Sequence, residues 1–300
     1  MAERVRGPGP RETMTKIMIQ RVEARRAAGE NVLAPWRMTW DPTIGQPRNL
    51  LSGHPYRGAN VWMTLMGGYS SPFWVTRKQI GQIGGKIKKR DGEFEPYTPI
   101  LFWWFPTPEQ EKAGRFAFCR FYQAWNVAQV AGIDGHPKLV LDAAEPKDPI
   151  VEAEALLGNY LGKPPIEHGK VKACYNPSGD NVWMPDRSVF ESSEAYYRAL
   201  FHEMTHSTGH RSRLARDGIV NPIKYASHDY SEEELVAEMG ATILASFAGI
   251  GSEEADENSA AYLDFWLAKL KAEPNMLAAA GGAAQKATDL IRGIKWEKAE

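Results

Sequence analysis

The stretch YYRALFHEMTHSTGHRSRL, from Tyr196 to Leu214, contains the pattern H-E-x-x-H at His202, Glu203 and His206. Two histidines four residues apart lie one above the other on the same face of an α-helix. Both imidazoles can then reach one metal ion at the ~2.0–2.1 Å typical of zinc. Glu203 stands beside them, where it can take a proton from water. The pattern predicts a metal site with His202 and His206 as ligands and Glu203 as the catalytic base.

The neighbouring residues favour a helix for this segment. Tyr197, Leu200 and Phe201 form an apolar stripe at helical spacing just before the motif. The serine pair 192–193 can cap the helix, and Gly209 suits its C-terminal end. The motif is therefore expected to lie on one helix.

A third protein ligand is needed to complete a catalytic zinc site. The arrangement H-E-x-x-H-x-x-G-x-x-H would place a histidine at position 212, but Ser212 stands there. His210 is an alternative ligand, although its offset of eight residues from His202 turns it away from the ligand face. The remaining source is the acidic segment SEEELVAE at 231–238.

Helical periodicity discriminates among the four glutamates of that segment. Glu234 and Glu238 share a stripe with small residues, which lets another helix approach closely, so we expect Glu234 to be the third ligand. Glu238, one turn later, is then placed to hydrogen-bond a ligand histidine from behind. Glu232 and Glu233 fit an interaction with the helix dipole. The expected ion is Zn²⁺, with Mn²⁺ as the alternative.

Length, composition and charge describe the rest of the chain. Its 300 residues, 43% hydrophobic and 24% charged, fit two globular domains better than one. Residues 1–140 carry 20 Lys/Arg and 11 Asp/Glu, a net charge of +9, whereas residues 141–300 carry 16 and 26, a net charge of −10. A basic half suggests a polyanionic partner, although solvated surface charge alone gives the same bias.

The charge switch also marks a domain boundary. It predicts a flexible N-terminus at 1–12, a first domain at 13–140, a linker at 141–149 and a second domain at 150–300. No stretch is long enough to cross a membrane, and the N-terminus lacks the apolar region of a secretory signal. The two cysteines form no C-x-x-C pair and are expected to be reduced. We therefore expect a cytoplasmic protein with no membrane partner.

Local patterns predict a mixture of helices and strands in the first half. We expect a helix over 13–28, a second helix starting near 71–72, and strands in TPILFWWF (98–105) and GRFAFCRFYQAWNV (114–127).

The second half is expected to be mainly helical. Helices are predicted over 150–161 and 231–248, with two short strands around the turn in KVKACYNPSGDNVWMPDRSVF (170–190). Within this segment, DNVWMP (180–185) is the expected edge strand along which an extended peptide lies.

Seven of the ten tryptophans lie in the first half, among many Lys and Arg residues. Unpaired bases stack on aromatic rings while basic side chains follow the phosphates, so this mixture favours single-stranded DNA. Most of these tryptophans are nevertheless expected in the core. The best candidates for contact with DNA are Tyr56, Arg57, Trp74, Arg77, Lys78, Lys86, Lys88 and Lys89.

Several long segments resemble a known family. PWRMTW, PRNLLSGHPYRGANVWMTL and YSSPFWVTRKQIGQIGGKIKK, between residues 35 and 89, resemble the N-terminal single-stranded-DNA-binding domain of ArdC-type antirestriction proteins, which also occurs in plasmid-encoded primases. YNPSGDNVWMPDRSVFESSEAYYRALFHEMTHSTGHRSRLAR (175–216) and EELVAEMGA (233–241) resemble the zincin-like metallopeptidase domain that follows it. The match covers about residues 13–250 in the right order.

The resemblance implies a plasmid- or phage-encoded protein that protects incoming DNA from host restriction. It places the family's H-E-x-x-H on His202, Glu203 and His206, and its E-x-x-A-E element on Glu234 and Glu238. The predicted fold class is α+β in two domains: an N-terminal α+β domain that binds single-stranded DNA, and a C-terminal, mainly helical, gluzincin-type metalloprotease domain that acts on a protein or peptide.

Two alternatives stay open at this point. One is a cytosolic zinc metallopeptidase with a basic recruitment domain. The other is a DNA-binding protein whose metal only braces the fold; an intact Glu203 argues against it, because a structural zinc usually has four protein ligands and needs no base.

Overall fold

The computed structural model describes residues 8–32, 34–40, 45–139, 148–221, 228–251 and 259–294. Its α-helices are α1 (Pro10–Ala27), α2 (Ala59–Leu65), α3 (Arg77–Gln82), α4 (Pro108–Lys112), α5 (Pro149–Gly158), α6 (Ser193–Ser207), α7 (Asp217–Val220), α8 (His228–Ala248), α9 (Ser259–Ala272) and α10 (Met276–Ile291). A 3₁₀ helix, η1, spans Pro35–Arg37. Most of the predicted N-terminal segment 1–12 and of the linker 141–149 lies outside the described residues.

The strands of the described residues form two main sheets and two short ribbons. They are β1 (Arg48–Asn49), β2 (Phe73–Thr76), β3 (Lys86–Ile87), β4 (Lys89–Arg90), β5 (Glu93–Phe94), β6 (Thr98–Trp104), β7 (Phe118–Asn126), β8 (Val130–Ala131), β9 (Ile166–Glu167), β10 (Cys174–Asn176) and β11 (Asn181–Trp183). The mixed architecture confirms the predicted α+β class.

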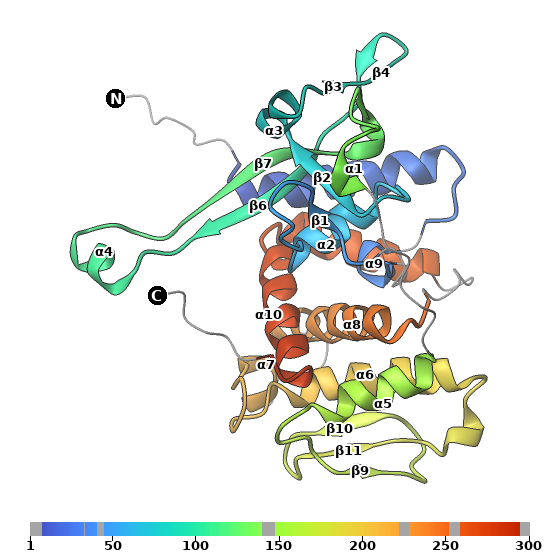
Figure 1. Ribbon diagram of the computed structural model, residues 1–300. Helices are drawn as coiled ribbons and strands as arrows, with labels where there is room; N and C mark the ends of the chain where they lie inside the picture. Colours follow the sequence, from blue (N-terminus) through green and yellow to red (C-terminus); the bar gives the residue numbers. More distant parts are fainter. Residues whose placement is uncertain are drawn as a thin grey trace.

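The N-terminal sheet has the strand order β1-β2-β7-β6, with β1 parallel to β2 and the other pairs antiparallel. The long pair β6–β7 runs from Thr98 opposite Ala124 to Trp104 opposite Phe118, and it confirms the two predicted strands. Beyond the body of the molecule this pair continues as a projecting hairpin with α4 at its tip (Figure 1). We call residues 102–122 the β6–β7 arm.

The prediction that a helix starts near residues 71–72 is wrong, because a strand comes first. Phe73–Thr76 forms β2, because its aromatic and β-branched residues are buried in the sheet, and α3 begins only at Arg77. Thr76 supplies the missing start signal, since its side chain accepts a hydrogen bond from the backbone N–H of Gln79.

The C-terminal half is layered, with a small sheet on one side of α5 and α6 and the long helix α8 on the other (Figure 1). The sheet has the order β10-β11-β9, and β10 and β11 form a hairpin around the predicted turn. The expectation that residues 180–185 form the edge strand is therefore wrong. β11 occupies the centre because β9, which precedes the hairpin in sequence, pairs with its outer side, and β10 is the edge that faces α6.

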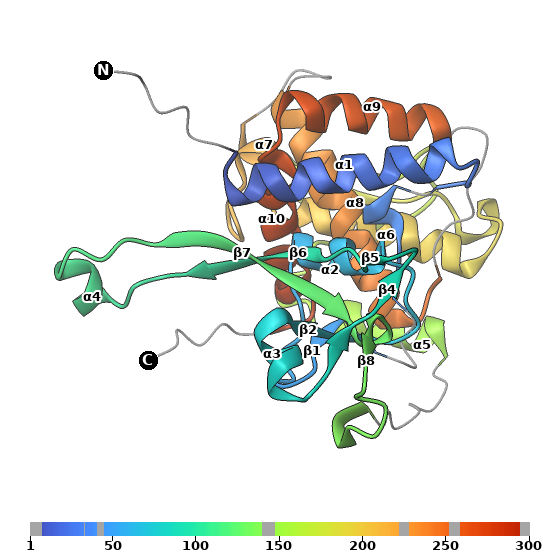
Figure 2. The same cartoon turned by 90° about the horizontal axis from the view of Figure 1, so that it is seen from above.

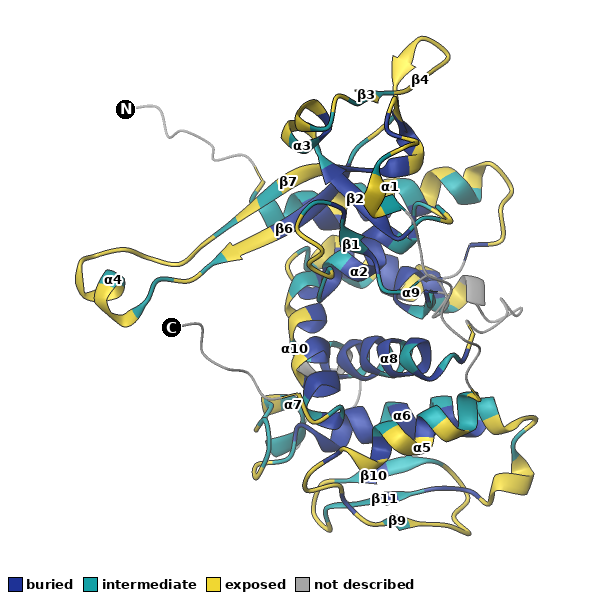
Figure 3. Ribbon diagram, viewed as in Figure 1, coloured by how far each residue is buried: buried dark blue, intermediate teal, exposed yellow. Residues whose placement is uncertain are grey.

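The largest hydrophobic core joins residues from both halves of the chain. Met14 and Met18 of α1, and Trp62 of α2, pack in one cluster with residues of α8, α9 and α10. Figure 2 shows α1 beside α9 on the same side of the molecule, and Figure 3 shows that α8 is buried or half-buried from residue 232 onwards. Gly281 permits the closest approach, because a Cβ there would lie 2.6 Å from the backbone nitrogen of Ala59.

Two further expectations concern the environment of the chain. Cys119 and Cys174 are both free thiols. Among the described helices, none combines the length and the apolar character that crossing a membrane requires.

Candidate metal centre

The two histidines of the H-E-x-x-H segment and Glu234 converge between α6 and α8. The Nε2 atoms of His202 and His206 are 3.1 Å apart. Carboxylate oxygens of Glu234 lie 3.5 Å from Nε2 of His202 and 3.6 Å from Nε2 of His206. In the part of the chain that the structure describes, this is the one group of His, Cys, Asp and Glu that can hold a metal ion, with all ligand atoms within 4.8 Å of one another. The structure thus brings together the three predicted ligands.

These separations fit a divalent ion. A tetrahedral ion with ligands at ~2.0–2.1 Å holds neighbouring ligand atoms roughly 3.3–3.4 Å apart, and the three measured distances fall on either side of that value. Two imidazoles and one glutamate are also the ligand set of well-known catalytic zinc sites. The chemistry and the spacing of these side chains therefore suit such an ion.

The approach of α8 to α6 depends on a glycine. A Cβ at Gly240 would lie 2.4 Å from Cγ2 of Thr205, so any larger residue would push the two helices apart. Ser192 fixes the start of α6, because its Oγ accepts a hydrogen bond from the backbone N–H of Ala195. Gly209 does not adopt the left-handed conformation of a helix cap. It is needed for packing, since a Cβ there would lie 2.6 Å from Cγ1 of Ile219.

The carboxylate behind the ligands is Glu233, and the prediction of Glu238 for this position is wrong. Oε1 of Glu233 lies 3.0 Å from Nδ1 of His206, an arrangement that favours the tautomer with the proton on Nδ1 and leaves Nε2 to bind metal. Glu238 instead pairs with Arg37, with Nε and Oε2 3.5 Å apart.

Arg216 holds Glu233 in place. Its Nε donates to Oε2 at 2.8 Å and its Nη2 donates to Oε1 at 2.6 Å, while Nη1 donates to Oγ1 of Thr208 at 2.6 Å. Burial raises the pKa of Glu233, but Arg216 and His206 outweigh it and keep the pKa below its ordinary value. The buried carboxylate is thus a fully paired anion that orients the imidazole of His206.

Carboxylates around His202 make the centre attractive to a cation. Burial lowers the pKa of His202, but the nearby Glu234, Glu238 and Glu203 more than compensate and raise it to about 9. A metal ion competes with that proton for the imidazole, so metal binding should release protons.

Glu203 lies between the ligands and the edge of the small sheet. Its Oε2 accepts a hydrogen bond from the backbone N–H of Tyr175 on β10 at 2.7 Å. The β10–β11 hairpin is anchored in turn by Arg213, whose Nη1 donates to Oδ2 of Asp180 at 3.0 Å. The hydroxyl of Tyr175 also donates to Oδ1 of Asp180 at 2.8 Å. The position of the predicted base is therefore fixed by backbone.

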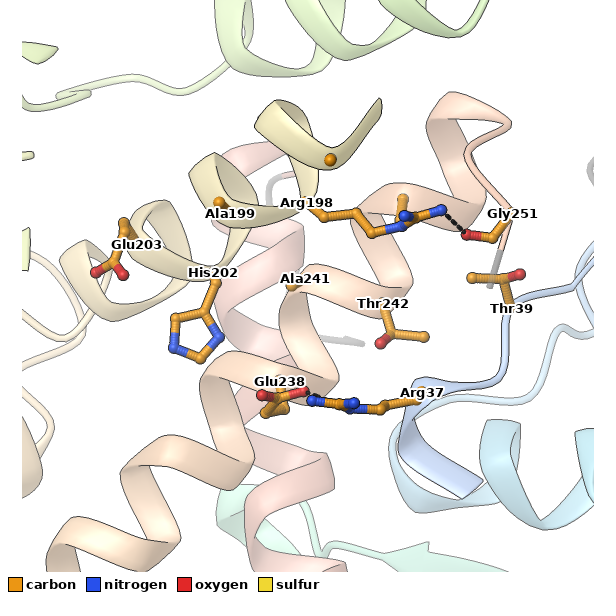
Figure 4. Close-up of a pocket in the computed structure, with 12 residues that line it drawn as sticks. Arg37, Thr39, Arg198, Ala199, His202, Glu203, Glu238, Ala241, Thr242 and Gly251 are labelled. Atoms are coloured by element: carbon orange, nitrogen blue, oxygen red, sulfur yellow. Dashed lines mark hydrogen bonds and ion pairs between the residues drawn. The ribbon is translucent and has the colours of Figure 1, made fainter. Parts of the chain in front are cut away.

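A cavity of about 310 Å³ opens beside His202 and Glu203. Its walls come from α6 and α8, and the segment that follows η1 closes one side (Figure 4). Its lining residues are Arg37, Thr39, Ala195, Arg198, Ala199, His202, Glu203, Glu238, Ala241, Thr242, Ala245 and Gly251. One candidate metal ligand and the predicted base thus face a space that a substrate group can enter.

The contact found for Glu233 gives a direct prediction. Glu233→Gln removes the charge that orients His206, so the affinity for Zn²⁺ should fall by roughly 10–100-fold. Glu238→Gln should cause a smaller loss, because Glu238 pairs with Arg37. Competition with a chromophoric chelator measures both affinities, and melting curves show whether each variant is folded. A larger loss for Glu238→Gln would contradict this arrangement.

The residues predicted to contact DNA fall into two groups, one buried or paired and the other exposed. Trp74 is only 1% exposed and packs edge-on against Tyr69, so it cannot stack on a base, and that prediction is wrong. Tyr56 packs against the cluster formed by Trp74, Ile100 and Ala124, and its burial raises the pKa of the phenol to about 12. Arg57 is directed towards α10, where it pairs with Asp289.

The remaining candidates lie close together on neighbouring elements at one end of the molecule (Figure 1). They are exposed and comprise Arg77 and Lys78 on α3, Lys86 on β3, and Lys88 and Lys89 near or on β4. Nζ of Lys88 donates to the carbonyl of Ala128 at 2.9 Å, and Nζ of Lys89 lies 4.8 Å from the ring centroid of Phe94. They form a basic surface, which we call the α3–β4 surface.

Sequence reasoning missed the aromatic face of the β6–β7 arm. By the strand register, Phe102 lies opposite Arg120 and Trp104 lies opposite Phe118, so all four share one face. Phe102 and Phe118 are 43% and 37% exposed, and the guanidinium of Arg120 lies 4.7 Å from the centroid of the Phe118 ring. The alternation in the sequence of β7 was the available signal, because it already placed Phe118, Arg120 and Tyr122 on one side.

The fold and the ligand set define a zincin-like metalloprotein joined to an N-terminal α+β domain. Residues 152–283 match a family model described as a zincin-like metallopeptidase, and residues 10–132 match that of the N-terminal domain of the anti-restriction factor ArdC. Two crystal structures of the antirestriction ArdC protein from the R388 plasmid, one metal-free and one Mn(II)-bound, are 30% identical and cover 93% of this chain and 96% of theirs, with TM-scores of 0.66 and 0.67. The chain belongs to the ArdC family of antirestriction proteins.

The chain also resembles a DNA primase TraC of Escherichia coli, with 31% identity over 287 residues. This match covers 86% of the chain but only 25% of the primase, so the chain spans about a quarter of that relative's length. The zincin-like fold implies a divalent metal, and the Mn(II)-bound relative means that its identity is not fixed as zinc.

Proposed function

We propose that this chain is a cytoplasmic antirestriction protein of plasmid or phage origin that binds single-stranded DNA and hydrolyses protein bound near it. The observation that carries the proposal is the cavity beside His202 and Glu203, because a metal that only braces a fold has no need of an open space or a base. Membership of the ArdC family supports the antirestriction role.

The chain's own residues supply the catalytic groups of this proposal. His202, His206 and Glu234 would hold a divalent ion, which when bound supplies Lewis acidity and lowers the pKa of water. Among the described residues, one oxygen of Glu203 is held by the Tyr175 N–H and the other is available to accept a proton from water. An extended peptide would lie along the edge strand β10, which leads to this carboxylate.

The N-terminal half offers both contacts that a single strand needs. The aromatic face of the β6–β7 arm suits stacking of unpaired bases, and the lysines of the α3–β4 surface suit phosphates. A second aromatic pair, Trp103 and Phe105, stacks at 6.1 Å and lines a cleft of about 1070 Å³ between the arm and α10. Arg11 lies over Trp103 in this cleft, with its Cζ 5.7 Å from the ring centroid.

Salt dependence tests the DNA-binding part of the proposal. The full-length chain should bind a labelled single-stranded oligonucleotide more tightly than the duplex, because paired bases hide their faces. Changing Lys86, Lys88 and Lys89 together to Gln should weaken binding and reduce the slope of log K against log salt by about 0.7 for each lost phosphate contact. Fluorescence anisotropy at several salt concentrations measures both effects. Tighter binding to duplex, or an unchanged slope, would contradict the proposal.

A further inference from the structure

The cavity beside the metal centre has one cation that no carboxylate of the described residues neutralises. Glu203 lies at the end next to His202, and Glu238 is paired with Arg37. Arg198 donates from Nη2 to the carbonyl of Gly251 at 2.7 Å, which uses one of its five N–H donors. Figure 4 shows its guanidinium reaching along the cavity on the side away from Glu203.

Arg198 stands in a fixed relation to the metal ligands. It precedes His202 by four residues on α6, so both side chains leave the same face of the helix and both line the cavity. A substrate group bound at the ligands can therefore extend along the same cavity towards Arg198.

The space between these groups is small and is kept open by alanines. Ala195 and Ala199 of α6 face Ala241 and Ala245 of α8 across it. Its volume of about 310 Å³ is at the lower end of the ~300–1,000 Å³ of ligand pockets. It therefore suits one side chain with a few water molecules.

The N-terminal half completes this cavity. Arg37 and Thr39 form its far wall, and Arg37 is held there by Glu238 and by the ring of Tyr262, 4.0 Å from its Cζ. Since the halves share one core, the cavity has a defined shape in the whole chain.

We propose that this cavity receives an acidic side chain of a peptide substrate, adjacent to the bond at the metal centre, with Arg198 as the residue that determines this specificity. A guanidinium and a carboxylate form two parallel charge-assisted hydrogen bonds, which a neutral side chain cannot match. The inference rests on the proposed function, because it requires that a ligand can reach the metal ion.

Two small hydroxamates test the proposal without requiring hydrolysis. Succinic acid monohydroxamate and its carboxamide analogue both carry a hydroxamate that binds metal, and they differ only at the far end. Isothermal titration calorimetry on the Zn²⁺-loaded full-length chain measures the affinity of each. We expect the carboxylate probe to bind about tenfold more tightly, as a charge-assisted hydrogen bond implies.

Three variants test whether Arg198 causes this preference for the carboxylate probe. Arg198→Gln should bring the ratio of the two affinities close to one while leaving the carboxamide probe's affinity unchanged. Arg198→Lys, which keeps the charge, should retain part of the preference. Arg211→Gln, an exposed arginine outside the cavity, is the matched control and should keep all of it.

The outcomes distinguish failure of the specificity proposal from failure of the proposed function. If both probes bind but with equal affinity, or if Arg198→Gln keeps the full preference, the specificity proposal is overturned and the open metal site stands. If neither probe binds to the metal-loaded chain, the proposed function fails and this inference fails with it.

Discussion

Replacing both His202 and His206 with alanine should reduce bound Zn²⁺ or Mn²⁺ from one equivalent to well under one. The double variant removes two of the three side chains whose ligand atoms converge within 4.8 Å. The loss in affinity should exceed the roughly 10–100-fold expected for an outer partner such as Glu233. Metal analysis after dialysis measures the occupancy, and the gain in melting temperature on adding metal should disappear because metal no longer stabilises the folded state.

Three single variants serve as comparisons for this result. Glu203→Gln should keep the full equivalent of metal, because Glu203 is not among the converging ligands. If peptides are hydrolysed, the same variant should lose about 10²–10⁴-fold in rate, which is the typical contribution of a general base. Glu234→Ala should weaken metal binding more than Glu232→Ala. Full occupancy in the histidine double variant would show that the metal binds elsewhere.

The metal centre was the part of the molecule most accessible to sequence reasoning, because its geometry is local. His202 and His206 are related by one turn of α6, and helical periodicity selected Glu234, which the structure places close to both histidines. The partner of His206 was not accessible in the same way. Consecutive glutamates differ by about 100° around a helix, so the choice of Glu233 depends on how α8 is rotated and on Arg216, which precedes it by 17 residues.

Features set by distant packing could not be predicted. β10 is the edge because β9 pairs with β11, a choice that the hairpin sequence does not contain. The charge switch near residue 140 predicted a boundary, but α9 and α10 lie far beyond it and pack on α1 and α2. For this reason experiments on DNA binding should use the full chain, since removing α9 and α10 would expose the core around Met14 and Trp62.

The exposure of individual aromatic residues also could not be predicted from the sequence. Trp74 and Phe102 both stand in apolar runs of the sequence, yet Trp74 is buried in the sheet and Phe102 is exposed on the arm. Hydrophobicity predicts burial only on average. The arm escapes the rule because its strands continue past the helices that cover the rest of the sheet (Figure 1).

Removing the aromatic face of the arm should therefore have a large effect on DNA and a small one on stability. Changing Phe102, Phe118 and Tyr122 to alanine removes three exposed rings that the strand register places on one face. Each stacked base contributes ~1–3 kcal/mol by alanine substitution, so affinity for a single-stranded oligonucleotide should fall by about 10²-fold or more. The melting temperature should change little, because surface substitutions away from the core have small effects.

A matched control separates stacking from general loss of apolar surface. Leu161, Val189 and Phe265 are 71%, 72% and 51% exposed, lie outside both the arm and the α3–β4 surface, and can be changed to alanine together. This control should bind the oligonucleotide as the unaltered chain does. The arm variant should also keep the salt dependence of the unaltered chain, because it loses no phosphate contact, whereas the lysine variant should lose slope. Equal losses of DNA affinity in the arm variant and the control variant would mean that the arm is not the stacking surface. Bases would then have to bind elsewhere on the N-terminal half.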